Sequence, residues 1–113
     1  MAYKNVFSAL ISLLVLLVLP LEAHAFDEDT ARTLARKNDC FMCHGVDKRK
    51  DGPSYRSVAE KYRGNKDAEA KLVNHLISGE VAKFTDGHLE EHKIINTKDV
   101  DQIKNLVNWI LSL

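Results

Sequence analysis

The sequence lacks an excess of charge of either sign. Lys and Arg together number 16, and Asp and Glu together number 16, so the formal net charge is zero with neutral histidines. A nucleic-acid-binding domain carries a basic excess, and the balanced charge argues against that class. The sequence also has no internal repeats and no low-complexity tracts. These absences leave a single small domain as the expected organisation.

The sequence also lacks an apolar run of the usual membrane-spanning length. The longest run, residues 6–19, has about fourteen residues, whereas a spanning helix needs roughly 20. Lys4 precedes the run and small residues end the segment at Ala25, which is the layout of a secretory signal peptide. We expect residues 1–25 to be removed, with an uncleaved anchor as the alternative. This predicts a periplasmic domain of residues 26–113 that has no membrane contact after cleavage.

No strand pattern appears in residues 26–113, which are typical of helices separated by loops. Acidic first turns, basic last turns and glycine stops predict the helices. They cover residues 26–39, 54–63, 66–78 and 98–113. Residues 80–97 are expected to be irregular or only partly helical. The domain is therefore predicted to be all-α, and a core this small usually needs a disulfide, a metal or a cofactor.

Apolar residues at helical spacing predict which sides of these helices face the core. In the helix over residues 66–78 the apolar face comprises Leu72, Val73, Leu76 and Ile77. In the last helix it comprises Ile103, Leu106, Val107, Ile110 and Leu111, with Trp109 at the edge. At the start of the last helix, Asp99 and Gln102 can form a capping box.

Only two cysteines occur, Cys40 and Cys43, and His44 follows the second directly. A disulfide across so short a loop would restrict the unfolded chain little. A catalytic dithiol of the thioredoxin type needs a βαβ context, which this sequence does not offer. A zinc site needs four ligands, and adjacent cysteine and histidine ligands are awkward for tetrahedral closure.

A covalently bound haem accounts for every part of this motif. Two thiols three residues apart can add across the two vinyl groups of one haem, and His44 then lies under the iron as a ligand. A secreted chain agrees, because covalent haem attachment takes place outside the bacterial cytoplasm. We expect one haem c, attached through two thioethers to Cys40 and Cys43. Zinc binding and dithiol chemistry remain the alternatives.

With these residues in place, the sequence resembles the class I c-type cytochromes, especially the small bacterial mono-haem electron carriers. The resemblance covers nearly all of residues 26–113 and rests on CFMCH, DGPSYRSVAEKY, KDAEAKLVNHLISGE and LVNWILSL. It implies a small cytochrome c fold of about four to five helices wrapped around one haem. It also implies that the first and last helices cross, with Leu106 and Trp109 against Leu34.

The GPSY segment adds implied roles in binding the cofactor. In the family, the proline carbonyl accepts a hydrogen bond from the haem-binding histidine. By resemblance, Pro53 would do so for His44, which would orient the imidazole and raise its donor strength. Gly52 would allow the turn, and Tyr55 belongs to the same cofactor-binding segment.

The sequence lacks a methionine where most of the family has the sixth iron ligand, in the loop before the last helix. Met1 lies in the predicted signal peptide, and Met42 lies between the two cysteines. The loop contains His92 and His88 instead. We expect His92 to bind the iron, with His88 as the second candidate. On a helical turn these two histidines would share one face.

Other arrangements at the sixth position stay open. The iron could have an open or water-bound site, or Lys93 could be the ligand. His75 lies off the apolar stripe of its helix. We expect it to be a surface or helix-packing residue, and it is a further candidate ligand.

The ligand set predicts the function. Imidazole in place of a thioether favours ferric iron, so we expect periplasmic one-electron transfer at a lowered potential. The partners would be a redox protein donor and an acceptor, with no nucleic acid and no enzymatic activity. The alternative is a haem-based sensor or binder of small gaseous ligands, with an open or labile sixth site. The oligomeric state stays open.

Overall fold

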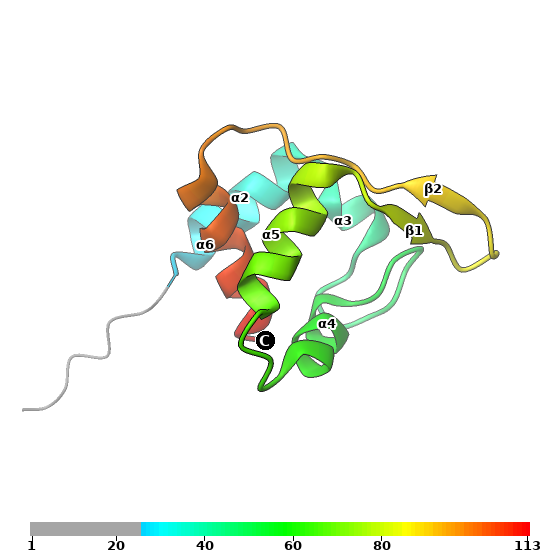
Figure 1. The fold of residues 1–113 in the computed structure, drawn as a ribbon, viewed down its shortest axis with the longest axis horizontal. Helices are drawn as coiled ribbons and strands as arrows, with labels where there is room; N and C mark the ends of the chain where they lie inside the picture. Colours follow the sequence, from blue (N-terminus) through cyan, green and yellow to red (C-terminus); the bar gives the residue numbers. More distant parts are fainter. Residues whose placement is uncertain (1–25) are drawn as a thin grey trace, which may run out of the picture.

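A computed structural model describes residues 26–113, so the predicted signal peptide lies outside the described residues. This part of the chain folds into a group of helices with one small hairpin at the side (Figure 1). The all-α prediction is confirmed, and the hairpin is a minor addition. The elements are α2 (Glu28–Lys37), α3 (Cys40–Cys43), α4 (Tyr55–Tyr62), α5 (Ala68–Ser78), β1 (Val81–Lys83), β2 (Leu89–Glu91) and α6 (Val100–Leu111).

Local capping explains where the first helices begin and end. Asp27 accepts a hydrogen bond from the Thr30 N–H at 3.0 Å and caps α2. Ser54 caps α4 in the same way, through the Ser57 N–H at 3.2 Å. Gly79 ends α5 with a φ of 68°, in the left-handed region that favours glycine. These ends agree with the predicted helices.

The start of α6 forms only one of the two reciprocal hydrogen bonds of the predicted capping box. Asp99 Oδ1 accepts hydrogen bonds from the N–H groups of Asp101 at 3.0 Å and Gln102 at 3.3 Å. The Asp99 N–H donates to Thr97 Oγ1 at 3.1 Å rather than to Gln102. The helix is therefore capped by one carboxylate without the reciprocal bond.

The prediction of irregular or partly helical structure over residues 80–97 is wrong for its first part. There β1 and β2 pair in antiparallel fashion, with Ala82 opposite Glu90. The connection contains Asp86-Gly87, and Gly87 has a φ of 93°, which suits a tight hairpin turn. In Figure 1 the hairpin projects on the side of the molecule away from α2 and α6.

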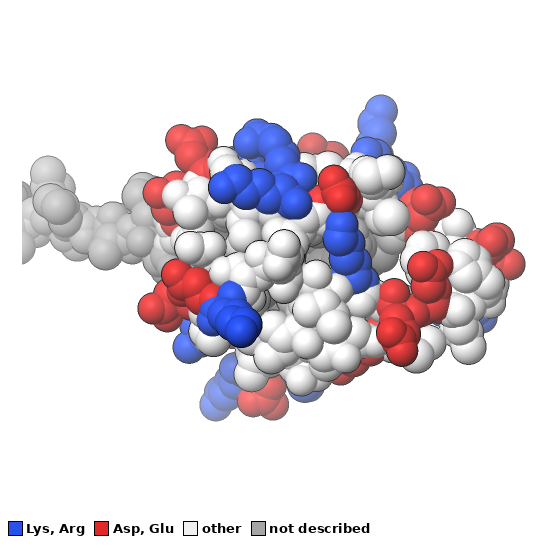
Figure 2. Space-filling view, turned by 90° about the horizontal axis from the view of Figure 1, so that it is seen from above, with Lys and Arg blue, Asp and Glu red and all other residues white. Residues whose placement is uncertain are grey.

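Charged side chains of both signs intermingle on the face of the molecule seen from above (Figure 2). No single sign dominates this face, in agreement with the zero net charge of the chain. Within residues 26–113, no helix is both long and apolar enough to cross a bilayer. The surface ion pairs include Arg32–Glu28 at 2.7 Å, Arg56–Asp47 at 2.8 Å and Lys93–Asp39 at 2.8 Å.

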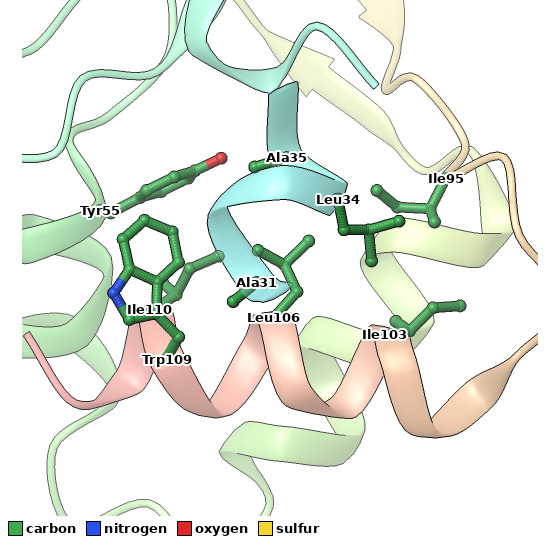
Figure 3. Packing of buried hydrophobic residues seen from close by; sticks show 9 residues of the cluster. All are labelled: Ala31, Leu34, Ala35, Tyr55, Ile95, Ile103, Leu106, Trp109 and Ile110. Carbon is green, nitrogen blue, oxygen red and sulfur yellow. The ribbon is translucent and has the colours of Figure 1, made fainter. Parts of the chain in front are cut away.

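The hydrophobic core lies where α2 crosses α6, and α4 and α5 pack against α6 as well. Side chains of α6 point toward α2 in Figure 3, where Tyr55 and Ile95 complete the cluster from other elements. Leu34, Leu106 and Trp109 all belong to this cluster, as the predicted crossing of the first and last helices requires.

The sequence pattern predicts Trp109 at the edge of the apolar face of α6, but in the structure Trp109 lies inside the core. Its side chain is only 1 % exposed. The rings of Phe41 and Tyr55 meet it edge-on, at centroid distances of 6.4 and 5.6 Å. These contacts come from residues distant in sequence, so helical periodicity alone does not reveal them.

The apolar face predicted for α5 is only partly covered by other helices. Leu72, Val73 and Leu76 are half-buried, and Ile77 is 48 % exposed. Leu72 and Leu76 line a large cavity. The helix therefore contributes one wall of a site as well as part of the core.

Candidate functional site

A cavity of about 1180 Å³ opens between α4, α5, the hairpin and the segment around α3. Pockets for small molecules and cofactors span about 300–1,000 Å³, so this one is large enough for a bulky cofactor. Both thiols line the cavity, together with His44, His75 and His92. Apolar side chains of α6 form part of its wall: Leu106, Val107 and Ile110.

Cys40 and Cys43 begin and end the single helical turn of α3. Residues three apart on a helix lie on the same side, and both thiols are free and half-buried. Burial raises the pKa of the Cys40 thiol. Met42, between them, is 74 % exposed. The helical turn thus presents two sulfurs to the cavity and the intervening side chain to solvent.

His44 follows α3 in an extended conformation. Its Nδ1 lies 2.7 Å from the carbonyl oxygen of Pro53. A carbonyl can only accept, so Nδ1 carries the proton and Nε2 keeps its lone pair. Burial lowers the pKa of His44, against the opposing effect of the Pro53 carbonyl. The imidazole is therefore held neutral and oriented, with one nitrogen ready to bind a metal.

Gly52 explains how the chain can pass so close to this imidazole. A Cβ at Gly52 would lie 2.5 Å from Cε1 and 2.8 Å from Nδ1 of His44. The Gly52 N–H donates to the Cys43 carbonyl at 2.8 Å, which draws the chain back toward α3. A glycine is needed here for space beside the ring. The turn itself does not require glycine, because Gly52 is not among the glycines with a positive φ, so the expected role in the turn is replaced by a steric one.

Tyr55 connects this side of the site to the core. Its ring stacks on His44 with a centroid distance of 5.3 Å and an angle of 18° between the planes. The Tyr55 ring also packs edge-on against Trp109 in the core. Burial raises the pKa of Tyr55, so its hydroxyl stays protonated. The stacked ring limits how far the His44 imidazole can rotate.

His92 faces His44 across the cavity. Their ring centroids are 6.0 Å apart, with the planes tilted by 45°. The Nδ1 of His92 lies 3.0 Å from the Lys93 carbonyl oxygen, so Nδ1 donates and Nε2 again keeps its lone pair. Burial lowers the pKa of His92, and the nearby His75 lowers it further. Both facing imidazoles are therefore neutral, and each has an Nε2 lone pair that could bind a metal.

His88 lies outside this arrangement, at the turn of the hairpin. Its Nδ1 pairs with the Asp86 carboxylate, its Nε2 lies 3.3 Å from Glu90, and its ring stacks on Phe84. The hydrogen bond that the His88 ring donates to the Asp86 carboxylate raises the pKa of His88, whose side chain is 48 % exposed. The expected helical turn, on which His88 and His92 would share a face, is wrong because β2 separates them.

His75 lies in the cavity wall and not simply on the helix surface. Its ring centroid is 4.2 Å from that of His92, and its Nδ1 lies 3.0 Å from Glu80 Oε2. His75 follows Leu72 by three residues, so it borders the cavity-lining side of α5 although it lies off the apolar stripe. The contact of Glu80 with His75 could not be predicted from the sequence pattern.

The residues of the cavity fit a covalently attached haem. Two thiols lie at one wall, and two neutral imidazoles face each other across the space between the walls. Metal–imidazole bonds are about 2.0 Å long, and two such bonds fit between rings whose centroids are 6.0 Å apart. Lys93 suits the metal less well, because its ammonium group is paired with Asp39 at 2.8 Å.

Comparison with known proteins agrees with this fit. The family model for cytochrome c matches residues 29–113. Cytochrome c-551 of Allochromatium vinosum is 38 % identical over 80 residues, which cover 71 % of this chain and 82 % of that protein. The class 1 cytochrome MtoD from Sideroxydans lithotrophicus ES-1 is 67 % identical, with a TM-score of 0.75 over 78 % of this chain and 97 % of that chain.

A more distant solved structure has the same fold. Wild-type cytochrome c552 of Nitrosomonas europaea is 28 % identical, with a TM-score of 0.60 over 73 % of this chain and 98 % of that chain. The family match includes both thiols and all the histidines of the cavity. The chain therefore belongs to the cytochrome c family, as a class I c-type cytochrome that carries one covalently attached c-type haem and transfers electrons.

Proposed function

We propose that this cytochrome is a periplasmic one-electron carrier whose haem iron is bound by His44 and His92. The facing imidazoles, with ring centroids 6.0 Å apart across the cavity, are the observation that carries the proposal. Each ring donates its Nδ1–H to a backbone carbonyl, that of Pro53 for one and that of Lys93 for the other. This leaves both Nε2 atoms available to a metal.

Cys40 and Cys43 are proposed to hold the haem through thioether bonds from their sulfurs. The haem supplies a one-electron couple between ferric and ferrous iron. The single turn of α3 fixes the spacing of the two sulfurs, and the stacked ring of Tyr55 limits rotation of His44. These residues thus position the cofactor and keep it from leaving, which a repeatedly used electron carrier requires.

The surroundings of the two histidines favour a closed coordination shell. A carbonyl acceptor on Nδ1 fixes the orientation of a ligating imidazole and raises its basicity toward the metal. Burial lowers the pKa of both His44 and His92, so protons compete weakly for the metal-binding nitrogens at neutral pH. A closed shell suits electron transfer, because no ligand has to enter or leave during turnover.

Two imidazole ligands imply a lower reduction potential than the usual histidine–methionine pair. A methionine ligand raises the potential of c-type cytochromes. Within residues 26–113 the one methionine is Met42, which lies between the cysteines and is 74 % exposed. We therefore place the protein nearer to electron donors than to a terminal oxidase in an electron-transfer chain.

The proposed location and partners follow from the same function. Residues 1–25 have the layout of a signal peptide, and export would bring the chain to the compartment where c-type haem is attached. One redox protein would reduce it and another would oxidise it, without catalysis by this chain itself. Charges of both signs on the face in Figure 2 favour weak electrostatic steering of such partners.

Ferric-state spectroscopy on two alanine variants tests the ligation. Wild-type protein is expected to give a low-spin electron paramagnetic resonance spectrum of two nitrogen axial ligands. His92→Ala is expected to become high-spin and to bind carbon monoxide rapidly when reduced. His88→Ala is the matched control, since it removes a histidine only four residues away that lies outside the cavity, and it should leave the spectrum unchanged.

Two results would contradict the proposal. A high-spin wild-type spectrum with rapid carbon monoxide binding would favour the sensing of gaseous ligands over electron transfer. A high-spin spectrum for His88→Ala but not for His92→Ala would assign the sixth position to the hairpin turn.

A further inference from the structure

The segment that carries the proposed sixth ligand, residues 92–96, has no helix or strand of its own. One side of it is fastened next to α5. The N–H groups of His92 and Ile95 donate to the carbonyls of Glu80 and Leu76, each at 2.9 Å. Ile95 is also only 5 % exposed and belongs to the core cluster. The segment is therefore attached to the fold by backbone bonds and one apolar side chain on this side.

Asn38 fastens the segment on the other side. It caps the end of α2 and is only 4 % exposed. Its Oδ1 accepts a hydrogen bond from the Asn96 N–H at 2.7 Å, and its Nδ2 donates to the Leu34 carbonyl at 2.9 Å. Both halves of the amide are used, and the bond to Asn96 joins positions 58 residues apart. A buried side chain thus links the end of α2 to the sixth-ligand segment.

Asp39 adds a second link beside the first. Its Oδ2 accepts from Lys93 Nζ at 2.8 Å, although both side chains are largely exposed. Exposed ion pairs are weak, so this link is the lesser of the two. Asp39 has a φ of 57°, in the left-handed region where Asn and Asp are among the most tolerated residues. Both linking residues directly precede Cys40, so they join the sixth-ligand segment to the haem-attachment segment.

We propose that Asn38, assisted by Asp39, is a positioning residue that keeps residues 92–96 closed over the haem and so makes the release of His92 from the iron slow. This inference rests on the proposed ligation by His92. For His92 to leave, the segment has to move outward, which breaks the bond from the Asn96 N–H to a buried amide. Asn38 is buried, so its Oδ1 would be left without a partner, which is costly, and this bond therefore raises the barrier to release.

Cyanide binding to the ferric protein measures this release. Cyanide reaches ferric iron only after the sixth ligand has left, so the rate at saturating cyanide reports the release of His92. Asn38→Ala is expected to raise that limiting rate about tenfold, the effect of one buried hydrogen bond. The low-spin spectrum should persist, because the ligand itself is unchanged.

Asn105 offers a matched control, because its side-chain amide also makes two hydrogen bonds that an alanine would remove. Its Oδ1 accepts from the Asp27 N–H at 2.6 Å, and its Nδ2 donates to the Asp27 carbonyl at 2.8 Å. This pair joins α6 to the start of α2 and does not touch residues 92–96. Asn105→Ala should leave the limiting rate within about twofold of wild type, and equal rates in Asn105→Ala and Asn38→Ala would overturn the proposal.

Asn38→Asp separates the two bonds of this side chain. The carboxylate keeps an oxygen for the Asn96 N–H but has no donor for the Leu34 carbonyl. Its limiting rate is expected to lie nearer to wild type than to Asn38→Ala. A rate equal to that of Asn38→Ala would overturn the proposal, since the effect would then come from the end of α2 and not from the link to Asn96.

If Asn38→Ala does not fold, Asp39→Asn tests whether the links to residues 92–96 slow the release of His92. It removes the ion pair with Lys93 and should accelerate release by about twofold. Asp47→Asn is its control, because it removes an ion pair of the same 2.8 Å length, with Arg56, away from the segment. Equal rates in these two variants would reject the proposed role of the link.

The ferric spectrum of His92→Ala keeps this inference separate from the proposed function. A low-spin spectrum in that variant would reject the ligation by His92 itself. A high-spin spectrum there, together with an unchanged cyanide rate in Asn38→Ala, would reject only the role of Asn38.

Discussion

The two sides of the cavity are built from very different lengths of sequence. On the His44 side, the histidine proposed to bind the metal and its Pro53 acceptor are nine residues apart, and Gly52 lies between them. On the His92 side, the links to Asn38 and Asp39 join positions 58 and 54 residues apart. The first side is thus specified by one short stretch, whereas the second exists only once the whole domain has folded.

This difference indicates how each side should respond to change. The residues of a local motif contact one another directly, so they act together and the loss of one is severe. A side assembled from distant segments pays the loop-closure entropy of each long connection, and its geometry depends on several weaker contacts. We expect substitutions on the His44 side to abolish or disrupt haem binding, and substitutions on the His92 side to tune the properties of a haem that is still bound.

The largest effect is expected from replacing Cys40 and Cys43 together by serine. This change removes both sulfurs that would form thioethers, so covalently attached haem should be lost completely. Extraction of the exported protein with acidified acetone measures it, since only covalently bound haem stays with the polypeptide. Met42→Leu, an exposed change between the two cysteines, should retain its pigment. Retention of the pigment by the double serine variant would contradict the assignment.

The next effect in size is expected for Gly52→Ala. The new Cβ would lie 2.5 Å from the His44 ring, and overpacking of this kind typically costs about 1–3 kcal/mol. Denaturant unfolding should show the loss of stability, and the ferric spectrum should show a disturbed His44 ligand. Gly64→Ala is the control: Gly64 has a φ of 76° with open space around it, so a cost of about 1 kcal/mol without a spectral change is expected.

On the other side of the cavity, His92→Met should leave the haem bound and change its potential. A thioether in place of imidazole raises the potential of c-type cytochromes, here by on the order of 0.1 V within the roughly 0.8 V that axial ligands cover. Redox titration measures the shift, and a near-infrared sulfur-to-iron band should accompany it. His88→Met should change neither quantity. An unchanged midpoint in His92→Met would indicate that residue 92 is not the sixth ligand.

The smallest effect concerns the hairpin turn, which lies outside the cavity. The hydrogen bond from the His88 ring to the Asp86 carboxylate raises the pKa of His88 above its ordinary value of about 6.5. The pairing therefore stabilises the fold fully below that pH and is lost as the pH rises through the folded-state pKa. Proton NMR of the His88 ring should show a midpoint above about 6.5, and Asp86→Asn should lower it more than Glu90→Gln does.

The same contrast explains what the sequence could predict about the fold. The helices follow from caps and glycine stops that act within a few residues, as with Asp27, Ser54 and Gly79. The hairpin did not follow, because strands of three residues are too short for a clear alternation of apolar and polar positions. Its one local signal was Asp86-Gly87, a dipeptide typical of tight hairpin turns.

For the site too, the residues of the short motif could be predicted from the sequence, whereas the residues brought together from distant segments could not. The thiols, His44 and Pro53 lie in one motif, so their proximity could be expected from spacing and from the family resemblance. The position of His75 beside His92 depends on how the segment after β2 lies along α5, which local periodicity does not determine. Asn38 has no signal of its own, because a buried asparagine can be recognised only from the backbone groups that its amide meets.

The chain has one tryptophan, and its place in the core gives the protein a built-in optical reporter. Trp109 touches Phe41, next to Cys40, which is proposed to attach the haem, and Tyr55, which stacks on His44. Energy transfer to a nearby porphyrin would quench its fluorescence in the folded, pigmented protein. Emission should therefore brighten when α6 separates from α2, so that disassembly of the core can be followed separately from the spectroscopy of the iron.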